Sequence, residues 1–325
     1  MRWTRRHDFL LANAQVLSIA AFFVACCALF AALSPIFLMP GNVLNLLRQS
    51  APMLIVATAM TFVITTGGID LSVGAIVALT NALAAVALAA GWPWPLAALA
   101  VLVAGGSIGG IQGWFTASQK IPAFIVTLAG LSSLRGLALL MTQGYSIPIA
   151  PRGIFLDLGR GWILGVPVPT WFALVVAVSG VVALGRMRYG RHVTAVGANP
   201  EAARRFGIPA ERIIASVYVL SGLSAALAGL IIAARLGSGS SNAAVGFELQ
   251  AIAAVVLGGT SLFGGSGTVL GTILGALTVA VIENGLILIH VSPFLTQIVT
   301  GAIILLAVWL NTRVFARLAA RRRTG

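Results

Sequence analysis

The sequence has very few charged residues. Asp, Glu, Lys and Arg make up 8% of its 325 residues, whereas hydrophobic residues make up 59%. A soluble domain carries about 25% charged residues, so this composition excludes an ordinary soluble domain. Apolar stretches near the length of about 20 residues that a helix needs to cross a bilayer recur along almost the whole chain. The sequence therefore predicts a membrane protein.

Residues that bind metals or nucleotides are also scarce. Lys120 is the only lysine, and it does not stand in G-x-x-x-x-G-K-[ST], the loop that cradles nucleotide phosphates. The three histidines are scattered. The two cysteines, Cys26 and Cys27, are adjacent in one predicted helix, which excludes a disulfide framework and a cysteine metal site. We therefore expect no metal, no cofactor and no catalytic residues in this chain, and any ATP must be hydrolysed on another one.

The apolar runs lack the polar alternation of membrane β-strands. We predict an all-α, polytopic fold of about ten transmembrane helices, with residues 1–325 forming a single transmembrane domain. The first helix is longer and less cleavable than a signal peptide, so we expect the chain to keep it. The expected spans are 14–34, 50–66, 71–90, 95–117, 122–142, 168–185, 212–234, 247–263, 266–290 and 294–311.

The net charge of +13 arises from basic residues that gather at helix ends. Lys and Arg accumulate on the cytoplasmic side of membrane proteins, so their positions predict two cytoplasmic termini and a cytoplasmic loop at 186–212. A nucleic-acid surface is not expected, because no folded soluble face carries these charges. The predicted cytoplasmic residues are Arg2, Arg5, Arg6, Lys120, Arg186, Arg188, Arg191, Arg204, Arg205, Arg212, Arg313, Arg317, Arg321, Arg322 and Arg323; those on the other side are Arg48, Arg152, Arg160 and Arg235.

The loop at 186–212 contains the signals for a short helix. Asn199 can cap its start, Pro200 suits the first turn, and Glu201 lies near the positive end of the helix dipole. Gly207 and Pro209 then end it. We predict a helix from Pro200 to Phe206 that lies across the membrane face.

This predicted helix offers a small apolar surface, formed by Ala202, Ala203 and Phe206 and flanked by Arg204 and Arg205. Such a surface is suited to a groove in a partner protein, and a rigid helix can transmit a push from that partner. A basic loop that rests on anionic lipid headgroups has the same composition. The residues alone leave both interpretations open.

Two glycine-rich segments, 67–74 and 258–265, share the pattern G-G-x-x-L-x-x-G. Internal repeats with glycine-interrupted helices are common beside the substrate path of transporters. We therefore predict an internal pseudo-repeat with helix breaks next to the pathway. For other glycines close helix packing is the expected role; these are Gly105, Gly106, Gly109 and Gly110.

Ionisable residues inside a bilayer are usually functional or paired. Asp70 and Arg135 therefore either form a pair or serve transport. Glu248 either lines the pathway, or is solvated or caps a helix at the start of a span. We expect the pathway to be lined by small residues and hydroxyls. The predicted pathway residues are Thr65, Thr66, Gly67, Gly68, Asp70, Ser72, Gly74, Glu248, Gly258, Gly259, Thr260 and Ser261.

Several longer stretches resemble the ribose-type (monosaccharide) permeases of binding-protein-dependent ABC importers. The sequence TTGGIDLSVGAIVAL at 65–79 is similar to the most recognisable segment of that family, and 195–204 and 246–267 continue the resemblance in order. Glu201 to Gly207 matches the family's E-A-A-x-x-x-G motif. Gln250 departs from it, because the family commonly has an acidic residue there.

The resemblance implies a permease of the bacterial inner membrane that pairs with a second copy or a similar subunit, most simply as a homodimer. It also implies a cytoplasmic ATP-binding subunit, which holds ATP and Mg, and a periplasmic sugar-binding protein, which selects the sugar. In that family the motif lies in the coupling helix, which docks on the ATP-binding subunit. The implied coupling residues are Asn199, Glu201, Ala202, Ala203, Arg204 and Gly207.

Two other functions stay open on the residues alone. An ion-coupled secondary transporter of a small polar solute would use Asp70 or Glu283 as its relay. An intramembrane enzyme or scaffold is the third, although no catalytic constellation is visible. The sequence names no particular sugar.

Overall fold

The computed structural model describes residues 14–150, 153–292, 295, 298–302, 305 and 309. This part of the chain is almost entirely helical, and seven of its helices are long and apolar enough to cross a membrane. Two shorter apolar helices are α4 (Val73–Ala89) and α12 (Phe247–Leu257). The seven are α2 (Ala14–Leu33), α3 (Pro40–Thr65), α5 (Trp94–Ala117), α6 (Ala123–Thr142), α8 (Val168–Gly185), α11 (Ala210–Leu236) and α13 (Val269–Leu288).

These helices confirm the prediction of a helical multi-pass fold, and most bounds lie close to the expected ones. The largest difference is α3, which begins ten residues before the expected start at 50 because polar residues in its first turns hide it from hydropathy. The second is α12, which ends at Leu257, where Gly258 and the left-handed Gly259 (φ 89°) interrupt the chain. Most of the last expected span, 294–311, and both termini lie outside the described residues.

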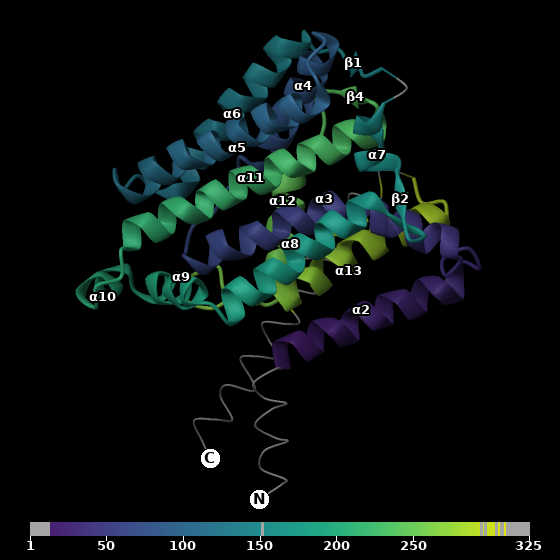
Figure 1. Ribbon diagram of the computed structural model, residues 1–325. Helices are drawn as coiled ribbons and strands as arrows, with labels where there is room; N and C mark the ends of the chain where they lie inside the picture. The colour runs from purple at the N-terminus through teal and green to yellow at the C-terminus, as the bar shows by residue number, and fades with distance from the viewer. Residues whose placement is uncertain are drawn as a thin grey trace, which may run out of the picture.

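The ends of the molecule differ in their short elements (Figure 1). At one end lie α9 (Arg188–Ala198) and α10 (Pro200–Arg205), which belong to the arginine-rich loop. At the opposite end lie α7 (Ile154–Arg160) and the strands. There β1 (Ile147–Pro148) pairs with β4 (Ser238–Gly239) and β2 (Trp162–Ile163) with β3 (Val166–Pro167), both antiparallel. We call the α9–α10 end the inner end, after the cytoplasmic side predicted for the arginine-rich loop, and the other the outer end.

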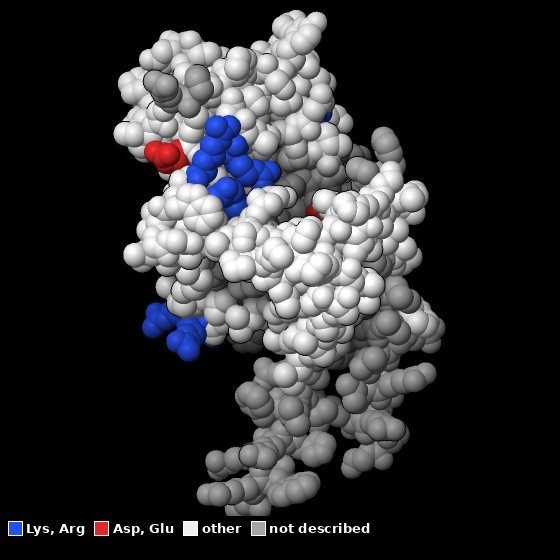
Figure 2. Space-filling view, turned by 90° about the vertical axis from the view of Figure 1, so that its right-hand side faces the viewer, with Lys and Arg blue, Asp and Glu red and all other residues white. Residues whose placement is uncertain are grey.

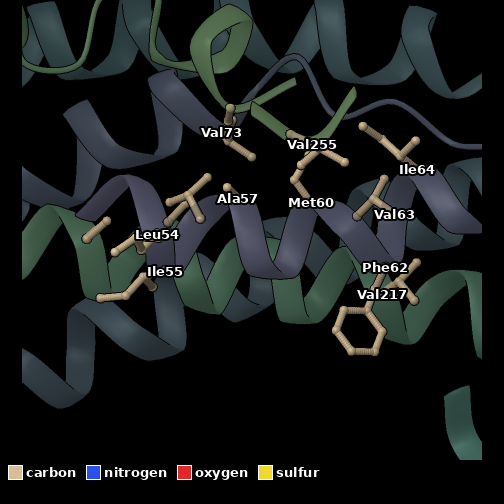
Figure 3. Close-up of a cluster of buried hydrophobic side chains, with 14 of the residues drawn as sticks. Leu54, Ile55, Ala57, Met60, Phe62, Val63, Ile64, Val73, Val217 and Val255 are labelled. Atoms are coloured by element: carbon tan, nitrogen blue, oxygen red, sulfur yellow. The ribbon is translucent and has the colours of Figure 1, made fainter. Parts of the chain in front are cut away.

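The core is centred on α3, which is buried on every side from Ser50 to Thr65. It packs against α8, α11, α12 and α13. Figure 3 shows its side chains, among them Met60 and Phe62, in one buried cluster with Val217 of α11 and Val255 of α12. In a bilayer, helix association depends on close van der Waals packing rather than on the hydrophobic effect. The tight packing around α3 therefore makes it the central helix of the bundle.

Glycines on one face of α5 form a close seam with α11. A Cβ at Gly105 would collide with the carbonyl of Gly222, and one at Gly109 with the carbonyl of Tyr218. The predicted packing role of these two glycines is therefore confirmed. The neighbouring Gly110 differs, because a Cβ there would make an ordinary contact of 3.7 Å with Val219.

Candidate functional site

The short helix predicted in the inner loop is present as α10. The Asn199 side chain caps it, since its Oδ1 accepts hydrogen bonds from the amides of Glu201 (3.0 Å) and Ala202 (2.9 Å). Gly207 follows with φ 80°, a conformation that glycine adopts without steric cost. The predicted cap at Asn199 and the predicted stop at Gly207 are thus confirmed.

The surface that α10 presents differs from the expected one. Ala203 is 4% exposed and belongs to the central core, because α10 folds back onto α9 and α11. The prediction that Ala203 forms part of an outward apolar surface with Ala202 and Phe206 was therefore wrong. The outward side consists of Phe206, which is 87% exposed, and the exposed pair Glu201 and Arg205, whose charged atoms lie 3.6 Å apart.

Side-chain contacts join the inner loop to the start of α11. Arg204 Nε donates a hydrogen bond of 2.6 Å to Glu211, and the Tyr189 hydroxyl of α9 lies 2.7 Å from that of Ser216. Burial raises the pKa of Tyr189, so its hydroxyl stays neutral and can donate. The start of α11 is therefore tied to α9 and to α10 by one polar contact each.

The inner loop also lies against both glycine-rich segments. A Cβ at Gly197 of α9 would collide with the Thr65 carbonyl at the end of α3 and with the Gly265 amide. That amide donates a hydrogen bond of 2.9 Å to the same carbonyl. A Cβ at Gly264 would lie 2.9 Å from the Gly67 amide. Three segments that are far apart in the sequence thus meet at the inner end with almost no side chain between them.

The predicted pathway residues next to this meeting point are buried and hydrogen-bonded. The hydroxyls of Thr65 and Thr66 donate to carbonyls of α3, at 2.6 and 2.7 Å. Asp70 accepts from the amide and hydroxyl of Ser72, at 2.9 and 2.6 Å, and from the hydroxyl of Ser221 at 2.7 Å. Asp70 therefore fixes the turn that begins α4.

The second glycine-rich segment is closely packed at its start, whereas Phe263 further along is 95% exposed. Gly258 lies against the backbone of Gly271 in α13, so that a Cβ there would collide. Thr260 is 3% exposed, and its hydroxyl lies 3.4 Å from the amide of Thr268. Gly68, Gly259 and Ser261 lie in the same two turns. The structure thus brings Thr65, Gly67 and the second glycine-rich segment together at the inner end. Asp70, in contrast, is hydrogen-bonded to Ser221 within α11, and Glu248 lies at the start of α12. The part of all these residues in a pathway stays a prediction.

Arg135 does not pair with Asp70, so that interpretation was wrong. Its guanidinium donates to the carbonyls of Ser241 (2.7 Å) and Ala243 (2.9 Å), in the loop before α12. That loop leaves carbonyls free of regular backbone pairing, and the arginine supplies the missing donors. Arg135 thereby holds the start of α12 against α6.

Glu248 is not solvated as one interpretation had it. Its side chain is 8% exposed and packs against Gly74, where a Cβ would collide with the carboxylate. It interacts electrostatically with Arg135, and its Oε2 has no hydrogen-bond partner among the described residues. Burying a carboxylate inside a membrane protein costs free energy, and such residues usually face the interior of the bundle and lie near an opposite charge, here Arg135.

A polar cavity of about 400 Å³ at the outer end was missed by the sequence analysis. Asn42, Asn45 and Gln49 of α3 line it together with Gln250 and Glu283. The three α3 residues precede the predicted span, and only their spacing of three and four, which places them on one helix face, could have indicated them. No cluster of three or more His, Cys, Asp or Glu that could hold a metal ion occurs in the described part of the chain.

Comparisons with known proteins agree with this architecture. The family model described as branched-chain amino acid transport system / permease component matches residues 42–308. The ribose import permease protein RbsC of Haemophilus influenzae is 41% identical over 86% of this chain and 88% of its own length. The Bacillus subtilis RbsC is 44% identical with the same coverage, and the xylose transport system permease protein XylH of Escherichia coli K12 is 36% identical over 85% and 86%. No solved structure matches. The chain belongs to this permease-component family and is a multi-pass protein of the bacterial inner membrane.

Proposed function

We propose that this chain is the membrane-spanning permease subunit of an ABC importer that moves a ribose-type monosaccharide across the inner membrane, driven by ATP hydrolysis on a partner subunit. Relatives named as ribose and xylose permeases, at 36–44% identity over most of the chain, support the sugar. The capped helix α10 with its exposed Phe206 supports the docking on a partner.

The proposed partners are a cytoplasmic ATP-binding subunit with its ATP and Mg, a periplasmic sugar-binding protein and a second copy of this permease. The chain itself would have no ATPase site, in keeping with its lack of a phosphate-binding lysine loop. We further propose ten spans with both termini in the cytoplasm and an internal pseudo-repeat. Support for the count comes from the seven long and two shorter apolar helices together with the apolar stretch 294–311.

One observation carries the proposed mechanism: α9 lies directly against the end of α3 and the segment 258–267 through Gly197. When the ATP-binding subunits close, they push α10, and α9 moves with it. Because backbone meets backbone at Gly197, the movement has no flexible side chain to absorb it. The end of α3 and the second glycine-rich segment then separate, and the buried residues around Thr65, Asp70 and Thr260 become the inner part of the pathway.

The proposal is tested by reconstituting the permease in liposomes with its ATP-binding subunit and sugar-binding protein and measuring uptake of labelled ribose and xylose. We expect uptake with ATP and none with a proton gradient alone. Glu201→Ala and Gly207→Val should abolish uptake and leave membrane insertion intact. For Gly207→Val the reason is the backbone, because valine is strained at the φ of 80° that Gly207 adopts. Gly185→Ala is the control, because a Cβ there meets open space.

Two results would contradict the proposal. Full uptake by the Glu201 and Gly207 variants would remove α10 as the coupling element. Uptake by the lone chain, driven by a proton gradient without ATP, would instead establish the ion-coupled transporter.

A further inference from the structure

The polar cavity at the outer end has the position and composition of a solute site. Figure 2 looks onto this end and shows a hollow with an acidic side chain at its base, beside a group of basic side chains. The cavity lies between the first half of α3, the end of α11, the start of α12 and the last half of α13. Its polar lining residues are Asn42, Asn45, Gln49, Ser50, Arg235, Gln250, Glu283 and Asn284.

Part of this lining is already paired and forms the walls. Asn42 and Asn284 exchange two hydrogen bonds of 3.0 Å, which tie α3 to α13. Gln250 donates a bond of 2.9 Å to Glu283, which ties α12 to α13. Interhelical hydrogen bonds of this kind hold membrane helices in register. These four side chains therefore fix the shape of the cavity.

Three of the remaining lining residues, Asn45, Gln49 and Arg235, have polar atoms that are unpaired within the described structure, whereas the Ser50 hydroxyl donates a bond of 3.3 Å to the Leu47 carbonyl. Among the described residues the amides of Asn45 and Gln49 have no hydrogen-bond partner, and both side chains are exposed. Arg235 Nη1 is buried without a partner. Buried polar groups are usually satisfied, so the buried Arg235 Nη1 lacks a partner that a polar ligand can supply. The exposed amides of Asn45 and Gln49 line the same cavity and are free to bind that ligand.

The chemistry of these groups selects the class of ligand. Each amide offers both a donor and an acceptor, which matches a hydroxyl that also donates and accepts. Glu283 opposes an anionic solute. Arg235, which interacts electrostatically with Arg48, opposes a cationic one. A volume of about 400 Å³ lies within the range of about 300–1,000 Å³ that small-molecule pockets have. A neutral, polyhydroxylated solute satisfies all of these conditions.

We infer that this outer cavity is the sugar-binding site of the permease, in which Asn45, Gln49 and Arg235 bind the hydroxyls of a monosaccharide released by the binding protein. The inference rests on the proposed function and assigns that function's substrate to particular residues. None of these residues was among the predicted pathway positions. The cavity and the inner glycine contacts would then be the two ends of one path.

The first test measures uptake of labelled ribose and xylose by the whole transporter reconstituted in liposomes. Asn45→Ala and Gln49→Ala should each lower uptake by about threefold to tenfold, and the double variant by about tenfold to a hundredfold. Their side chains have no partner in the described structure, so folding should be unaffected. Asn242→Ala is the control, because this exposed amide lies outside the cavity lining, and it should transport like the wild type.

The second test does not depend on which sugar is carried. Replacement of Cys26 and Cys27 by Ala removes both native thiols. Gln49→Cys in that background should then react with a membrane-impermeant thiosulfonate added outside, as should the control Asn242→Cys. A Gln49→Cys thiol that stays unlabelled while Asn242→Cys reacts would overturn the inference.

The outcomes separate the inference from the proposed function. A wild-type transporter that imports neither sugar with ATP refutes the proposed pentose import, and the labelling still decides whether the cavity opens to the outside. A wild type that imports sugar while both alanine variants keep its rate refutes the cavity alone.

Discussion

The two halves of α3 are built for different tasks. Its outer turns place Asn42, Asn45 and Gln49 on a polar cavity, and the last two of these side chains are exposed. Its inner half, from Ser50 to Thr65, is buried on all sides, and its threonines bond to the helix itself. At the inner end backbone contacts replace side chains. One helix thus joins an open polar end to a closely packed one.

This difference indicates where the molecule must move. On the proposed path, a solute enters the outer cavity, and the backbone contacts among Thr65, Gly197 and Gly265 must separate before it leaves at the inner end. The inner end is also where the arginine-rich loop lies. The predictions below test this contrast from its strongest point to its weakest.

The largest effect is expected at Gly197. The Cβ of Gly197→Ala would collide with the Thr65 carbonyl, so α9 must shift away from α3. Overpacking of this kind costs about 1–3 kcal/mol, and we expect ATP-driven sugar uptake to fall by at least about tenfold. Gly136→Ala is the matched control, since a Cβ there meets nothing within 4 Å. Equal uptake by both variants would show that the inner contact transmits no movement.

The seam between α5 and α11 offers a test of rigidity. Gly109→Ala should lower the free energy of unfolding by about 1–3 kcal/mol, because the new methyl collides with the backbone of Tyr218. Gly110→Ala, one residue away, should be nearly neutral or slightly stabilising, because it removes a helical glycine where there is room. Thermal unfolding in detergent, followed by size-exclusion chromatography, measures both. Equal unfolding temperatures for Gly109→Ala and Gly110→Ala would contradict the close contact at Gly109.

A smaller effect is expected at the cap of α10. Asn199→Ala removes the acceptor for the amides of Glu201 and Ala202. Loss of an N-cap costs about 1 kcal/mol, so hydrogen exchange at these two amides should accelerate about fivefold, while the outer turns of α3 keep their rates. Unchanged exchange at α10 would mean that docking, not the cap, orders the helix.

The smallest effect is expected at the pair of Arg204 and Glu211. Both side chains are partly exposed, at 37% and 42%, and such pairs contribute about 0–1 kcal/mol. A double-mutant cycle with Arg204→Ala and Glu211→Ala, read by thermal unfolding, should give a coupling energy in that range that shrinks in high salt. A much larger coupling would make this pair a main link between α10 and α11.

The sequence was most informative where local rules decide the structure. The cap at Asn199, the stop at Gly207 and most of the spans follow from single residues and from hydropathy. It was less informative where polarity and helicity disagree. The outer turns of α3 are polar yet helical, because they face a cavity and not lipid.

By itself the sequence determined that this is a helical membrane protein with a basic inner loop, since length, hydropathy and charge act without regard to distant contacts. Only the tertiary structure decided which glycines touch, that Arg135 serves carbonyls instead of Asp70, and that amides from α3, α12 and α13 share one cavity. These features depend on how helices are rotated and packed against one another. That rotation is set by the fit of many side chains at once, which no local pattern encodes.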